Sequence, residues 1–295
     1  MNHPLSRRSA IARIGGGSAT LGVAMQLAPA SALSKPLPSE SSSLKGNINH
    51  SVCKWCYSKT SLKDLCASAA KFGMASVELL SPKDWKTLNK HNLICAMSNG
   101  PGGITKGFNR LENHGWLKEG FDRMIPQVAN AGYPNIICFS GNRNGLDDEQ
   151  GIENCATGLK KIIALAEKKK VTVCMELLNS RVNHKDYQCD HTEWGVELVK
   201  RVGSERFRLL YDIYHMQIME GDVIRTIRTY SEYIAHYHTG GNPGRNEIDE
   251  TQELNYPAIM KAIRQTGFKG YVAQEFIPTR EPMISLQEAV KLCDV

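Results

Sequence analysis

The stretch FRLLYDIYHMQIMEGD, residues 207–222, begins as an apolar strand and carries an aspartate, Asp212, inside it. A histidine, His215, follows three residues later. A carboxylate within an apolar strand costs free energy unless another group pairs with it. We therefore expect Asp212 to belong to a polar site whose other members come from elsewhere in the chain.

Short apolar runs of this kind recur along the chain and alternate with segments of helical periodicity. They span residues 50–57, 75–80, 93–98, 135–140, 171–179, 207–215, 234–240 and 271–277. Runs this short and this apolar are typical of buried parallel strands. Eight strands with helices between them predict an α/β fold, a (β/α)8 TIM barrel. A doubly wound open sheet is the alternative, but no GxGxxG follows the first strand.

The first 32 residues differ in composition from the rest. Arg7 and Arg8 precede a Gly/Ala-rich apolar run, and Ala30–Ala32 has the small-x-small pattern of a cleavage site. This order predicts a signal peptide of the twin-arginine type over residues 1–32, and hence a periplasmic or exported protein. The alternative is a disordered basic tail on a cytoplasmic protein.

Beyond the signal, residues 33–47 are rich in Ser and Pro and are expected to form a flexible linker, followed by the barrel over residues 48–295. Loss of the signal would remove three arginines and no acid, lowering the formal net charge from +6 to +3. A charge this mild gives no support to nucleic-acid binding. No later apolar run is long enough to cross a membrane, so no stable insertion is expected after signal removal.

The chain has nine cysteines, most of them inside the predicted strands and helices. There a free thiol packs as a small apolar side chain. Cys53 and Cys56 form a CxxC pair, but no second pair or nearby histidines complete a zinc site. We expect structural thiols, with Cys53–Cys56 the pair for which a disulfide stays open.

The last four predicted strands carry ionisable side chains near their carboxyl ends. In chain order these are Glu176, Asp212, His236 with His238, and Glu275. In a parallel barrel the carboxyl ends of the strands meet at one face, where active sites are built. Three carboxylates brought together there repel one another unless a cation joins them. Oxygen ligands with one imidazole suit Mg²⁺, Mn²⁺ or Co²⁺ better than a structural zinc ion.

Two of these stretches have the form of known signatures. MELLNSR (175–181) is similar to E-P-L-N-x-R, with Leu177 in place of the proline, and YDIYHMQIMEGD (211–222) matches a sixth-strand signature almost residue for residue. Both signatures are those of the hydroxypyruvate isomerase branch of the xylose isomerase-like barrels, which this chain therefore resembles.

Two later stretches strengthen the resemblance. NPGRNEID (242–249) resembles the seventh loop of that branch, N-P-G-R-x-E-P, with Ile248 in place of the proline. YVAQEF (271–276) resembles its eighth-strand pattern, G-[YW]-x-[GS]-x-E-[YF]. The resemblance covers residues 48–280 and is strong over residues 171–278.

The resemblance implies a metal-dependent isomerase acting on a small hydroxy-carbonyl compound, of the hydroxypyruvate–tartronate semialdehyde type. It places the metal ligands on Glu176, Asp212, His238 and Glu275, which would hold one divalent ion, with no organic cofactor. The metal would stabilise an enediolate. Glu176 and Glu275 would remove and return the proton that moves between adjacent carbons.

Three further residues are implied to bind the substrate. His215 would hydrogen-bond a substrate oxygen and help to polarise the carbonyl; a packing histidine is the alternative. Arg245 would clamp a substrate carboxylate with two parallel hydrogen bonds, or else be a solvated loop arginine. Glu247 would orient Arg245 or bind substrate. Glu78, in ASVELL, would either approach the site or have a purely structural role in the barrel.

His238 leaves the reaction open, because hydroxypyruvate isomerases usually carry Gln at this position and the related ketose 3-epimerases carry His. The alternative function is therefore a ketose 3-epimerase, or another keto-sugar isomerase or dehydratase, acting on a sugar in the exported compartment.

A zinc endonuclease barrel would need more histidines on the early strands and a basic face. A non-catalytic sugar-binding protein would not need both Glu176 and Glu275. The expected partner is a small-molecule substrate, and family members often form homo-oligomers.

Overall fold

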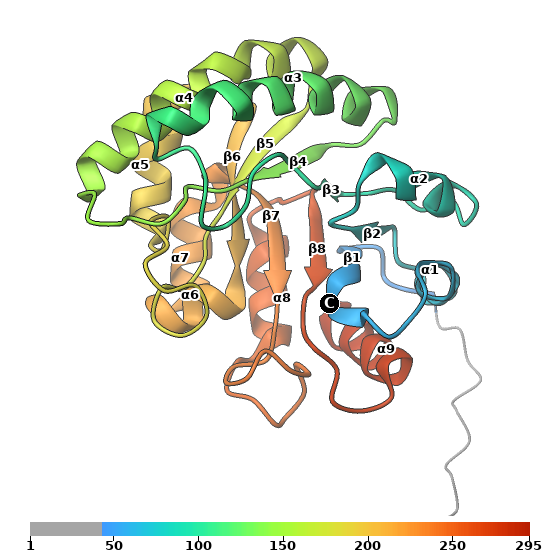
Figure 1. The fold of residues 1–295 in the computed structure, drawn as a ribbon. Coiled ribbons are helices and arrows are strands. Elements are labelled where there is room, and N and C mark those ends of the chain that lie inside the picture. The colour runs from blue at the N-terminus through green and yellow to red at the C-terminus, as the bar shows by residue number, and fades with distance from the viewer. Residues whose placement is uncertain (1–42) are drawn as a thin grey trace, which may run out of the picture. The chain divides into compact units, whose positions relative to one another are not determined.

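The computed structural model describes residues 43–295, where eight parallel strands alternate with helices (Figure 1). The strands are β1 (Asn49–Cys53), β2 (Ser76–Glu78), β3 (Met97–Ser98), β4 (Asn135–Cys138), β5 (Thr172–Glu176), β6 (Phe207–Asp212), β7 (Ile234–Thr239) and β8 (Tyr271–Gln274). Each predicted apolar run overlaps one of them. The predicted export signal and most of the predicted linker lie outside the described residues.

The helices lie outside the strands (Figure 1). They are α1 (Leu62–Lys71), α2 (Pro82–Asn89), α3 (His114–Asn130), α4 (Asp148–Lys169), α5 (Thr192–Val202), α6 (Ile213–Met219), α7 (Val223–Tyr230), α8 (Tyr256–Gln265) and α9 (Pro282–Cys293). Single 3-10 turns occupy Lys54–Tyr57, Leu111–Asn113 and Ser231–Tyr233. The neighbouring helices α3, α4 and α5 pack side by side over one part of the sheet (Figure 1).

The sheet has the strand order β2-β1-β8-β7-β6-β5-β4-β3, so the first strand pairs with the last. Parallel bridges between Ser76 and Ile94, and between Leu80 and Ser98, join the two edges. The strands therefore form a nearly closed barrel. The predicted TIM barrel is confirmed, because an open doubly wound sheet would not pair β1 with β8.

Helix α4 illustrates why the intervening segments are helical. Asp147 caps its start, accepting a hydrogen bond from the backbone N–H of Gln150 at 2.8 Å. Lys170, in the left-handed conformation, ends it. Its buried face repeats every three or four residues, at Ile152, Cys155, Ala156, Leu159, Ile162, Ile163 and Ala166. This stripe packs against the barrel, as the helical periodicity predicts.

Inside the barrel, an apolar layer lies beneath a polar one. Met97, Ile137, Cys174 and Leu210 form a buried cluster within the strands. Successive residues of a strand point to opposite faces, so residues two apart share a face. The residues two positions after Cys174 and Leu210 are Glu176 and Asp212. Glu176 and Asp212 therefore point into the barrel directly above the apolar cluster, at the carboxyl ends of their strands.

The predicted strand over 207–215 extends too far. Strand β6 ends at Asp212, and the next residue begins α6. The side chain of Asp212 caps this helix by accepting a hydrogen bond from the backbone N–H of His215 at 3.1 Å. Ile213 and Met216 are apolar because they lie on the buried side of a helix, not because they continue a strand. Asp212 therefore ends the strand rather than interrupting it.

All nine cysteines lie within the described residues as buried free thiols, Cys53 and Cys56 included. Burial raises the pKa of both thiols well above the usual range.

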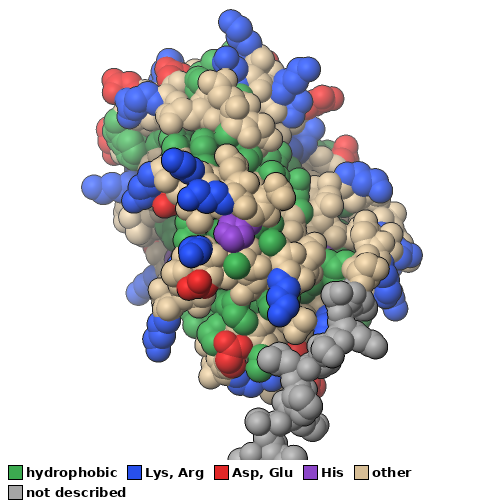
Figure 2. All heavy atoms as spheres, turned by 90° about the vertical axis from the view of Figure 1, so that its right-hand side faces the viewer, with side chains coloured by type: hydrophobic (Ala, Val, Ile, Leu, Met, Phe, Trp, Pro, Cys, Tyr) green, Lys and Arg blue, Asp and Glu red, His purple; other side chains and the backbone are tan. Residues whose placement is uncertain are grey.

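Over residues 43–295, none of the helices combines the length and apolar character needed to cross a bilayer. On the face shown in Figure 2, acidic side chains are interspersed with lysines and arginines, and no continuous basic stripe is visible there.

One buried histidine makes the stability of the barrel depend on pH. His50, near the start of β1, is 1% exposed, and within residues 43–295 neither ring nitrogen has a hydrogen-bond partner. Burial lowers the pKa of His50 to about 4, against the opposing charge of Asp294. The pKa in the unfolded chain is about 6.5, so protons bind preferentially to the unfolded state. The contribution of a neutral His50 is complete above pH ~6.5 and is lost as the pH falls towards 4.

We expect His50→Leu to remove about 3 kcal/mol of the acid-induced loss of stability between pH 7 and pH 4, since the pKa of about 4 lies roughly 2.5 units below 6.5. Urea unfolding at the two pH values measures it. His91→Gln, at a partly exposed histidine, is the control and should follow the wild type. Equal acid sensitivity in His50→Leu and wild type would contradict the prediction.

Candidate metal centre and active site

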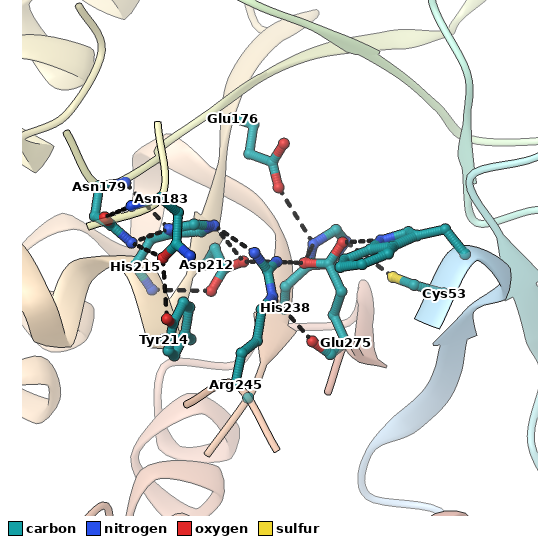
Figure 3. Close-up of polar contacts among 12 residues, drawn as sticks. Cys53, Glu176, Asn179, Asn183, Asp212, Tyr214, His215, His238, Arg245 and Glu275 are labelled. Carbon is teal, nitrogen blue, oxygen red and sulfur yellow. Dashed lines mark hydrogen bonds and ion pairs between the residues drawn. The ribbon is translucent and has the colours of Figure 1, made fainter. Parts of the chain in front are cut away.

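The four predicted metal ligands meet at the mouth of the barrel (Figure 3). Glu176 ends β5, Asp212 ends β6, His238 lies near the end of β7 and Glu275 follows β8. Each offers one ligand atom, and these four atoms all lie within 4.8 Å of one another. All four side chains are buried. Asp212 and His238 are direct register partners on adjacent strands, which accounts for their closeness.

His238 is surrounded by carboxylates. Its Nδ1 lies 2.7 Å from Oε2 of Glu275 and 3.4 Å from Oε1 of Glu176. The donor set of three carboxylates and one imidazole nitrogen fits a hard or borderline divalent cation. Such an ion would also offset the charge that the carboxylates bring into a buried site. The residues present therefore fit the divalent metal that the sequence predicts.

A fixed positive charge, Arg245, also enters the cluster. Its Nη2 donates to Oδ2 of Asp212 at 3.0 Å and to the carboxylate of Glu275, and its Nε donates to the backbone carbonyl of Glu275 at 3.2 Å. The guanidinium carbon lies 5.2 Å from the ring centroids of both Trp55 and Tyr214. Arg245 is only 8% exposed, so it is not a solvated loop arginine.

These contacts limit what Arg245 offers to a ligand. A parallel two-nitrogen clamp needs two neighbouring guanidinium nitrogens, and both Nε and Nη2 already bind protein oxygens. Only Nη1 faces away from these acceptors. The arrangement therefore differs from the predicted bidentate clamp, because the metal-ligating carboxylates hold one edge of the guanidinium.

The orientation of His215 follows from its neighbours. The backbone N–H of Asn179 lies 3.1 Å from Nδ1, and the guanidinium of Arg245 faces Nε2, so both ring nitrogens meet donors and the neutral ring can accept at one of them. Burial, with Arg245 acting in the same direction, holds the pKa of His215 well below its usual range. Nε2 lies 2.8 Å from Nη1 of Arg245. The N–H groups of an arginine can only donate, so a ligand oxygen would have to replace this contact to accept from Nη1.

Glu247 lies apart from this cluster. Its carboxylate accepts hydrogen bonds from the backbone N–H and hydroxyl of Thr279, each at 2.9 Å, and from the hydroxyl of Ser285 at 2.8 Å. Burial alone would raise the pKa of Glu247, but hydrogen bonds from its own backbone N–H, from Ser285 and from Thr279 outweigh it and lower the pKa to about 2. Glu247 ties its loop to the segment after β8. The structure places its carboxylate on these partners and not on Arg245.

Trp55 is a site residue that the sequence analysis did not identify. Its indole N–H donates to Oε1 of Glu275 at 2.7 Å, while its ring covers Arg245. The available signal was its place immediately after β1. The predicted strand over 50–57 obscured that signal, because it kept Trp55 inside the strand.

A cavity of about 360 Å³ opens beside the cluster. Glu176, Glu275 and Arg245 line one part of it, with His184. The remaining wall comes mainly from the earlier strands and their loops: Trp55, Leu79, Asn99, Ile104, Ile137, Phe139 and Leu178. A cavity of this size suits a small molecule.

The carboxyl groups of the cluster have opposite pKa shifts. Burial raises the pKa of Glu176 and of Asp212 above the usual carboxyl range. Burial acts in the same direction on Glu275, but Arg245 and His238 outweigh it and hold the pKa of Glu275 well below its usual range. Divergent shifts among adjacent carboxyl groups are typical of functional sites.

The family described as "Xylose isomerase-like TIM barrel" matches residues 66–292. The chain belongs to this family. A hydroxypyruvate isomerase of Escherichia coli (strain K12) is 28% identical over 228 residues, covering 71% of this chain and 85% of the relative. A human protein named putative hydroxypyruvate isomerase is 25% identical over 172 residues, covering 55% of this chain. That alignment spans about 60% of the human relative's length.

Within the same fold, a solved structure titled as an AP endonuclease, family 2, from Brucella melitensis superposes with a TM-score of 0.73. The two sequences are 26% identical, and the superposition covers 81% of this chain and 96% of that one. This likeness extends over the whole barrel and agrees with the family match.

The positive charge of Arg245 offsets part of the negative charge of the buried carboxylates, and its removal should destabilise the protein. Removing one partner of a buried ion pair costs about 3–5 kcal/mol, so we expect Arg245→Met to lower the free energy of unfolding by about that much in the presence of a chelator. Added Mn²⁺ should recover part of the loss, because it supplies replacement positive charge. Urea unfolding with and without Mn²⁺ tests this.

The matched control is Arg280→Met, at an arginine whose side chain is 48% exposed. It should change the free energy of unfolding by no more than about 1 kcal/mol. If Arg245→Met were as stable as Arg280→Met in chelator, Arg245 would not be balancing the buried carboxylates.

Proposed function

We propose that this protein is a divalent-metal-dependent isomerase that moves a proton between adjacent carbons of a small hydroxy-carbonyl compound, of the hydroxypyruvate–tartronate semialdehyde type. The observation that carries the proposal is the grouping of Glu176 and Glu275 around His238 on the wall of a small cavity. Relatives named hydroxypyruvate isomerase support the choice of substrate.

Glu176, Asp212, His238 and Glu275 would hold the metal. When bound, a divalent cation supplies Lewis-acid polarisation of a carbonyl and its neighbouring hydroxyl. The position of the cluster beside the cavity puts that chemistry within reach of a small ligand.

The remaining steps belong to side chains of the protein. One of Glu176 and Glu275, as a carboxylate, removes the proton alpha to the carbonyl, and the other, protonated, delivers a proton to the neighbouring carbon while the hydroxyl hydrogen passes to the former carbonyl oxygen. Exchange with solvent then restores the starting protonation of both carboxyl groups. Nη1 of Arg245 lies 2.8 Å from Nε2 of His215, and a substrate oxygen on which negative charge develops would replace this contact. That oxygen would then accept from Nη1, and from Nε2–H of His215 once the two side chains separate.

Trp55 and Asp212 hold this machinery in place. The indole N–H of Trp55 occupies Oε1 of Glu275, and the capping bond of Asp212 fixes the start of the helix that carries His215. Groups held in this way need little reorganisation during the reaction.

The second candidate function is 3-epimerisation of a free ketose or another keto-sugar conversion, and His238 is the observation that favours it. An exported location also favours a sugar over an intracellular metabolite. Both reactions begin with removal of a proton alpha to a carbonyl. Isomerisation then adds a proton to the neighbouring carbon, whereas 3-epimerisation returns one to the opposite face of the same carbon.

Proton exchange in D2O distinguishes the two functions. Protein loaded with Mn²⁺ is incubated with hydroxypyruvate, D-fructose and a 3-keto-sugar, quenched and stripped of metal, and then analysed by NMR. We expect solvent deuterium in the product of hydroxypyruvate and none at C3 of the ketose. Exchange confined to C3 of the ketose would establish the epimerase instead.

Glu176→Gln and Glu275→Gln should each lower kcat at least 100-fold, the usual scale of general acid–base catalysis. Glu288→Gln, at a carboxylate on the exposed side of α9, is the control and should leave kcat unchanged. If Glu275→Gln retained full activity on every candidate substrate, the proposed catalytic role would be wrong.

We also propose export through the twin-arginine-type signal over residues 1–32. The double variant Arg7→Lys, Arg8→Lys should retain the full-length protein in the cytoplasmic fraction, whereas the wild type should appear shortened in the exported fraction. Identical fractionation of both proteins would contradict the proposal.

A further inference from the structure

A fourth buried carboxylate, Glu78, lies on the side of His238 that faces away from the predicted metal ligands. It ends β2 and is 0% exposed. Its Oε1 lies 2.9 Å from Nε2 of His238 and 2.8 Å from Nε2 of His236. Its Oε2 accepts a hydrogen bond from the hydroxyl of Ser51 on the neighbouring strand β1.

These contacts define the protonation of the His238 ring. A carboxylate that already accepts from Ser51 offers only acceptor oxygens to its other neighbours. Nε2 of His238 therefore carries the hydrogen that Glu78 accepts. Nδ1, which lies 2.7 Å from Glu275 and 3.4 Å from Glu176, is then the nitrogen that faces the predicted metal ligands and would offer its lone pair to a bound metal.

The position of Glu78 is itself fixed. Val52 and Cys53 of β1 are the register partners of Val77 and Glu78, and His236 braces the same carboxylate oxygen from β7. Three strands thus hold the acceptor in place. A histidine that ligates a metal commonly donates its other N–H to a carboxylate, which sets its tautomer and its orientation.

We propose that Glu78 is a positioning residue that holds the His238 ring with Nδ1 towards the metal centre, with His236 and Ser51 holding Glu78. Glu78 touches neither substrate nor metal and acts through His238. The inference rests on the proposed metal site and is independent of the substrate's identity. Under this proposal Glu78 belongs to the metal site and does not have the purely structural role that the sequence also allows.

The test is the affinity for Mn²⁺ alone, measured by calorimetry and by electron paramagnetic resonance. Glu78→Gln should weaken binding by about 10- to 100-fold, the usual effect of losing such a partner. Glu78→Asp keeps the charge but shortens the side chain, and its affinity should fall between those of Glu78→Gln and wild type. At saturating Mn²⁺, kcat of Glu78→Gln should recover most of the wild-type value, because the ligands themselves are intact.

The control is Ser98→Ala, at a buried side chain of β3 whose hydroxyl has no partner within residues 43–295. It should bind Mn²⁺ as the wild type does. ¹⁵N NMR of labelled histidine adds a direct readout. His238 should carry its hydrogen on Nε2 in the wild type, and this preference should weaken in Glu78→Gln.

Wild-type affinity for Mn²⁺ in Glu78→Gln, or an equal loss in Ser98→Ala, would overturn the inference. If Glu78→Gln does not fold, a wild-type His238 without a hydrogen on Nε2 would overturn it equally. Failure of the wild type to bind Mn²⁺ would instead count against the proposed function, so the two failures are distinguishable.

Discussion

The rest of the site depends on one electrostatic constraint: three carboxylates are buried within ligand distance of one another. Like charges this close in a low-dielectric interior repel strongly unless positive charge is supplied. Arg245 supplies one fixed charge, and a divalent cation bound by Glu176, Asp212, His238 and Glu275 would supply the remainder. With that ion the three carboxylates and the guanidinium form a neutral centre around a neutral imidazole. The stacking of Arg245 between Trp55 and Tyr214 follows from the same need, because a buried guanidinium has to be held where its charge is used.

The barrel meets this constraint through the alternation of its strands. Cys174 and Leu210 belong to the apolar cluster, and the next inward positions on the same strands are Glu176 and Asp212. The change from apolar to ionic therefore occurs within two residues. It leaves the lower layer free to pack tightly while the upper layer carries the chemistry, and a one-residue slip in either strand would turn the carboxylate away from the site.

Much of this arrangement could be predicted from the sequence, because strand periodicity and the position of an ionisable residue at a strand end are local properties. The eight strands and the ionisable residues near the ends of the last four are of this kind, whereas the choice of His238 over His236 came from the family resemblance. The contacts of Arg245, Trp55 and Glu78 depend on strands and loops far apart in the chain, and no local pattern reports them. The end of β6 was misplaced because apolar residues of a buried helix turn look the same as those of a buried strand. Glu247 lies only two residues from Arg245, yet its hydrogen bonds reach a different segment, so proximity in sequence was a poor guide.

The carboxylate beneath His238 has a consequence for the variability of this position among related barrels. Glu78 accepts a hydrogen bond from Nε2 of His238, while Nδ1 of the same ring faces the other predicted metal ligands. A glutamine at position 238 would meet the same two demands, because its amide N–H2 could donate to Glu78 while its carbonyl oxygen faced the other predicted ligands. A change of this one side chain would therefore replace a nitrogen ligand by an oxygen ligand and keep the hydrogen bond to Glu78.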